Sequence, residues 1–90
     1  MERPENIPHN SKLLKGTGES AWFRIKASNE NGIFFITRYS LSGVRECHYK
    51  AKLNDIDFKL DDNFEVTYVS HCLKCTVVQN EQTFVFVKIS

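Results

Sequence analysis

The chain has 90 residues, of which 41% are hydrophobic and 26% are charged, and its formal net charge is +1. This length allows one domain with one hydrophobic core, and the composition excludes a disordered chain. The near balance of acidic and basic side chains argues against a domain built around nucleic acid, and no apolar run is long enough to span a membrane.

The three cysteines indicate reduced thiols. A small secreted domain that depends on disulfides normally carries an even set. The residues before position 16 contain no continuous apolar segment of the kind that a secretory signal has. We therefore expect a cytoplasmic protein with free thiols, and we expect no cofactor.

Residues 1–15 predict a flexible N-terminal arm ahead of a single β domain over residues 16–90. Pro4 and Pro8 favour an extended or irregular path at the start of this arm. One short helical turn is expected over residues 12–15, because capping residues precede it and glycines follow it.

From residue 21 onward the chain consists of short segments rich in aromatic and β-branched residues, with turn residues such as Asn31-Gly32 between them. The predicted strands cover residues 21–28, 33–40, 44–53, 56–60, 64–70, 73–79 and 83–89. Connections this short join antiparallel neighbours, because parallel strands need a longer crossover. The sequence therefore predicts an all-β fold in which an antiparallel meander of about seven strands rolls into a small barrel. A two-layer sandwich is the alternative.

The loop at Gly43 predicts the register of one hairpin, because glycine readily adopts the left-handed conformation that the third position of a three-residue loop requires. The predicted pairs are Tyr39 with Arg45, Arg38 with Glu46, Thr37 with Cys47 and Phe35 with Tyr49. Arg38 and Glu46 would then lie on the outer face, near Trp22. The predicted core residues are Phe23, Ile25, Phe35, Tyr39, Cys47, Tyr49, Phe64, Val66, Tyr68, Leu73, Cys75, Val77, Phe84 and Phe86.

The segment SHCLKC, residues 70–75, is the candidate metal site, because it holds two cysteines and a histidine. Cys72 and Cys75 have the spacing of a zinc knuckle, and His71 and Cys47 could complete the ligands. On an extended strand, however, residues three apart point to opposite faces. We therefore favour a sheet in which Cys47 and Cys75 are small buried hydrophobes, with a zinc-stabilised domain as an alternative.

Basic side chains alternate with an aromatic on the predicted outer face of the first strands. The residues are Trp22, Arg24, Lys26, Arg38, His48 and Lys50. Cations interleaved with an aromatic ring are typical of a surface that binds single-stranded nucleic acid, so a weak binder of this kind is one alternative. The other is a solvated face on which Arg38 packs against Trp22.

The last predicted hairpin is apolar on both faces, since Val78, Val85 and Val87 lie away from the predicted core. Such a C-terminal strand at the edge of a sheet predicts a protein partner, or a homodimer formed by strand addition. No carboxylate pair, phosphate loop or Ser-His-Asp set has workable spacing, so we expect no enzyme. The leading hypothesis is a non-enzymatic module that binds a protein partner, or a small ligand inside the rolled sheet.

The segments GTGESAWFRI, ITRYSLSGVREC, SHCLKCTVVQN and TFVF resemble a family of short, uncharacterised bacterial proteins of the Bacteroidetes type, classified as a domain of unknown function. The resemblance runs from Gly16 to the end of the chain. The matching positions are Gly18, Trp22, Phe23, Arg38, Tyr39, Gly43, Glu46, Cys47, Ser70, His71, Cys72, Cys75, Gln79 and Asn80. The resemblance implies a bacterial, cytoplasmic setting and implies no activity, because none is assigned to that family.

Overall fold

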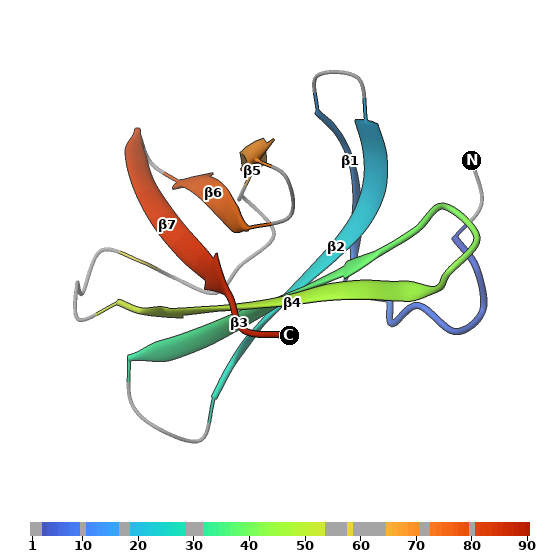
Figure 1. The fold of residues 1–90 in the computed structure, drawn as a ribbon, viewed down its shortest axis with the longest axis horizontal. Coiled ribbons are helices and arrows are strands. Elements are labelled where there is room, and N and C mark those ends of the chain that lie inside the picture. The colour runs from blue at the N-terminus through green and yellow to red at the C-terminus, as the bar shows by residue number, and fades with distance from the viewer. Residues whose placement is uncertain are drawn as a thin grey trace.

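The computed structural model describes residues 3–9, 11–16, 19–28, 32–53, 58, 65–70, 73–79 and 81–90. The strands in these residues are β1 (Lys12–Gly16), β2 (Glu19–Ala27), β3 (Ile33–Tyr39), β4 (Arg45–Lys52), β5 (Glu65–Ser70), β6 (Lys74–Gln79) and β7 (Gln82–Lys88). They form one antiparallel sheet, in the order β1-β2-β3-β4-β7-β6-β5, that curls into a half-barrel (Figure 1). The predicted all-β fold with a curled antiparallel meander is therefore confirmed.

β1 to β4 are neighbours in the order of the chain. The other half of the sheet holds β7, β6 and β5, which is the reverse of their order in the chain. β7 pairs with β4 on one side and with β6 on the other, so the edge strands are β1 and β5. The expectation that the C-terminal strand lies at an edge is wrong. Residues 53–64 connect β4 to β5. A connection of this length can pass β7 and β6 and reach the far edge of the sheet, so β4 and β5 need not be neighbours.

One predicted element differs from the structure, and another falls largely outside the described residues. Residues 12–15, predicted as a helical turn, belong to β1, because a ladder with β2 satisfies more backbone groups than one isolated turn can. The strand predicted over residues 56–60 lies outside the described residues except for Phe58, which is not in a strand. The sheet thus begins at Lys12, whereas the division of the chain at residue 16 and the flexibility of the arm stay predictions.

The core lies on the inner face of the curled sheet. Its residues are Ala21, Phe23, Ile25, Ile36, Cys47, Tyr49, Ala51, Phe58, Val66, Cys75, Val77, Phe84 and Phe86. Most of the predicted core is confirmed, but Leu73 is exposed because it lies in the turn that precedes β6. Phe64 and the side chain of Tyr68 lie outside the described residues.

A β-bulge between β3 and β4 shifts the predicted register by one residue. Tyr39 pairs with Arg45 as predicted, but the other pairs are Arg38 with Cys47, Thr37 with His48, Ile36 with Tyr49 and Phe35 with Lys50. Glu46 is the extra residue on β4. Because side chains alternate with a period of two, the shift moves Phe35 and Tyr39 to the outer face and turns Ile36 into the core. The prediction that Phe35 and Tyr39 belong to the core is therefore wrong.

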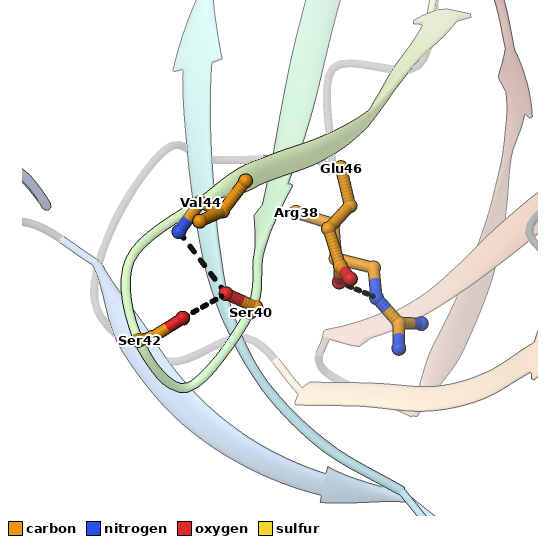
Figure 2. Close-up of polar contacts among 5 residues, drawn as sticks. All are labelled: Arg38, Ser40, Ser42, Val44 and Glu46. Atoms are coloured by element: carbon orange, nitrogen blue, oxygen red, sulfur yellow. Dashed lines mark hydrogen bonds and ion pairs between the residues drawn. The ribbon is translucent and has the colours of Figure 1, made fainter.

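The β3–β4 loop has the predicted conformation at Gly43, whose φ is 95°. The backbone N–H of Val44 donates to the hydroxyl of Ser40 over 3.0 Å, and this hydroxyl also contacts that of Ser42 over 2.9 Å (Figure 2). The side-chain amide of Asn6 donates to the carbonyl of Gly43, so the N-terminal segment is attached to this end of the sheet.

Candidate binding surface

The outer face of β2, β3 and β4 gathers basic and aromatic side chains in rows that run across the strands. We call it the basic face and define it by Arg24, Lys26, Phe35, Thr37, Tyr39, Arg45, His48, Lys50 and Lys52. In one row, Lys26 on β2 and Lys50 on β4 flank the half-buried ring of Phe35 on β3. Cross-strand neighbours of this kind have Cβ atoms about 4.5–5.5 Å apart, so both exposed ammonium groups can reach the space above the ring.

The next row holds His48 in a fixed orientation. Its imidazole lies parallel to the ring of Phe35, with the ring centroids 5.4 Å apart and the planes at 16°. The hydroxyl of Thr37 and Nδ1 of His48 share a hydrogen bond of 2.9 Å. Burial, then the positive charges of Arg45 and Lys26, hold the pKa of His48 below its ordinary value. At neutral pH the imidazole is therefore an uncharged flat ring.

The cations of the basic face have no acidic counterpart in the part of the chain that the structure describes. Among the described residues, none of them forms an ion pair, and no described carboxylate lies in the rows of this face. The cations are Arg24, Lys26, Arg45, Lys50 and Lys52. Nε of Arg24 is buried without a hydrogen-bond partner.

Arg38, predicted as part of this surface, lies instead on the inner face. Its Nε donates to Oε1 of Glu46 over 3.1 Å (Figure 2), and its guanidinium lies 5.8 Å from the centre of the Phe23 ring. The predicted contact between Arg38 and Glu46 is confirmed. Its predicted place on the outer face against Trp22 is wrong, because the bulge shifts the register and Arg38 pairs with the core residues Phe23 and Cys47.

Trp22 lies on the outer face, beside Tyr39 in the register, but its exposed fraction is only 6%. It does not belong to the core cluster, and neither does the buried Ile7 of the N-terminal segment. Residues 3–9 run past the β3–β4 loop at this end of the sheet (Figure 1). Trp22 is therefore buried and offers no exposed ring to a ligand.

Two cysteines of the proposed zinc site, Cys47 and Cys75, lie in the described residues. Cys47 and Cys75 are buried core residues, as expected, and both are free thiols. Burial raises the pKa of Cys75 to about 12, so its thiol stays protonated, whereas a zinc ligand must be a thiolate. His71 and Cys72 lie outside the described residues. Among the residues that are described, no group of three or more His, Cys, Asp or Glu could hold a metal ion.

The fold and this surface define a small antiparallel β-domain with one basic face. Residues 11–89 match the family described as the DUF6695 C-terminal domain, so the chain belongs to this family, which is a domain of unknown function. Comparisons with curated proteins and with solved structures found no match. No helix with the length and hydropathy that a membrane crossing needs occurs in the described part of the chain.

Proposed function

We propose that this domain is a non-enzymatic binding module and that the basic face binds an anionic partner. The observation that carries the proposal is the set of five cations without a described acidic counterpart. Solvated faces usually intersperse both signs, and the chain as a whole is almost neutral. A surface of one sign attracts a partner of the opposite sign, and salt weakens this attraction.

Heparin, a flexible polyanion without rings that stack, tests this proposal. Binding measured by calorimetry should weaken steadily as sodium chloride is raised. The double variant Lys26→Glu/Lys50→Glu should lower the affinity at least about tenfold, which corresponds to about 1.4 kcal/mol.

The matched control compares Lys50→Glu with Lys88→Glu, which makes the same change of charge at an exposed position of β7 that pairs with Tyr49 and so faces the other side of the sheet from Lys50. Lys88→Glu should retain most of the affinity. An equal loss for Lys50→Glu and Lys88→Glu would show that only net charge matters, and it would refute the basic face as the binding surface.

We propose a second contact, with another copy of the chain, at the outer side of β7. Val85, Val87 and Ile89 are 49%, 57% and 50% exposed there, and such an apolar strip is typical of a protein interface. Because β7 pairs with β6 along most of its length and with β4 at Val87 and Lys88, the contact would use the exposed side chains rather than strand addition. Sedimentation velocity should find a dimer that Val85→Thr/Val87→Thr converts to a monomer. A wild-type protein that stays monomeric at high concentration would refute this contact.

A cytoplasmic, bacterial setting with reduced thiols is also our proposal. Its support is the odd number of cysteines, the free thiols of Cys47 and Cys75, and the resemblance of the sequence to bacterial proteins. A small-ligand pocket inside the sheet has less support, because Tyr49, Phe58 and Phe86 occupy the inner face.

A further inference from the structure

We propose that the anionic partner of the basic face is single-stranded nucleic acid. In this assignment the rings of Phe35 and His48 stack on bases, and Lys26 and Lys50 contact phosphates. The inference rests on the proposed function, because it names the class of partner for the same surface.

The ring pair is suited to stacking because its position is already fixed. Phe35 and His48 are parallel, and the hydrogen bond between Thr37 and His48 restrains the imidazole. A base that stacks on a restrained ring loses less affinity to side-chain ordering than one that stacks on a mobile ring. Stacking on aromatic side chains contributes to binding of every base, so it tolerates any sequence.

The cations lie where a backbone that follows stacked bases would pass. Lys26 and Lys50 are on either side of Phe35, and Arg24 lies in the adjacent row with its buried Nε unpaired. Tyr39 is four residues along β3 on the same face, which corresponds to about 13 Å at the usual rise of a strand. A single strand that lies along β3 can therefore meet rings and cations alternately.

The same geometry distinguishes single strands from other polyanions. A duplex presents phosphates but keeps its bases stacked inside, so it would use the cations and not the rings. An acidic protein segment would likewise pair with Lys26 and Lys50 and has no need of a parallel ring pair. The rings therefore favour unpaired bases, as in proteins that combine a basic surface with aromatic stacking.

The test measures fluorescence anisotropy of a labelled oligodeoxythymidylate of about twelve nucleotides, a length within the usual site sizes of single-strand binders. The wild-type protein should bind it more tightly than a duplex of equal length, and affinity should fall as salt is raised. Phe35→Ala should weaken binding to the single strand at least about fivefold and leave heparin binding within about twofold. Phe35→Leu keeps an apolar side chain of similar size and should show the same selective loss, which separates stacking from any folding defect.

Three results would overturn the inference. If heparin binds and the oligonucleotide does not, the proposed function stands and the partner is an acidic protein or another polyanion. If the duplex binds as tightly as the single strand and both Phe35 variants bind normally, the face recognises charge alone. If no polyanion binds, both the inference and the proposed function fail.

Discussion

Replacing Phe58 with alanine is expected to lower the free energy of unfolding by about 3–5 kcal/mol, the usual cost of removing a buried aromatic ring. Phe58 is buried and packs edge-on against two other rings, with centroids 4.7 Å from Phe34 and 5.0 Å from Phe84. It also lies near Phe86. A small domain has only about 5–15 kcal/mol of stability in total, so the variant should be largely unfolded at moderate temperature. Urea unfolding followed by circular dichroism measures the loss.

The control for Phe58 is Phe35→Ala, which removes the same ring from the half-buried outer face. Phe35→Ala should lower the free energy of unfolding clearly less than Phe58→Ala does, because fewer contacts are lost and no closed cavity forms. Phe58→Leu should lie between the two. A loss below about 1 kcal/mol for Phe58→Ala, the size of an average substitution, would show that this ring does not fill the core.

The position of Phe58 shows what periodicity can and cannot predict. Alternation and turn residues correctly predicted β2, β3, β4, β5, β6 and β7, because each has apolar residues toward the core. Residues 56–60 have the same local pattern and were therefore predicted to form a strand. Phe58, however, is not in a strand and still belongs to the core. β1 was missed because the glycines at 16 and 18 were interpreted as the end of a helical turn, whereas Gly16 pairs with Glu19 and the two strands are close neighbours in the sequence.

The candidate surface was predicted in part. The alternation of Arg24 with Lys26 placed both on the outer face, and the structure agrees. Phe35 and Tyr39 could not be placed with them, because one inserted residue at Glu46 changes which side chains of β3 face inward. No local signal marks such a bulge. The near-neutral charge of the whole chain also concealed the surface, since composition does not report where charges lie.

The ion pair at the bulge gives the second large effect. Glu46→Ala is expected to cost about 1.5–3 kcal/mol, because it removes a charged acceptor from the guanidinium of Arg38. The side chain of Arg38 is only 9% exposed, so it cannot replace the lost partner with free access to water. The side chain of Glu46 is 41% exposed, which keeps the cost below that of breaking a fully buried pair. Chemical denaturation measures the change.

A double-mutant cycle isolates the interaction energy between Arg38 and Glu46 from the energies of their other contacts. Arg38→Met keeps the apolar length of the side chain over Phe23 and removes the charge that Glu46 compensates. The double variant Arg38→Met/Glu46→Ala should therefore be more stable than Glu46→Ala alone, because the charge that Glu46 compensates is no longer buried there. The coupling energy should be at least about 0.5 kcal/mol, as for residues in direct contact. If the free-energy changes of the two single variants simply add in the double variant, the pair of Arg38 and Glu46 does not stabilise the fold. Other contacts would then hold Arg38 in place.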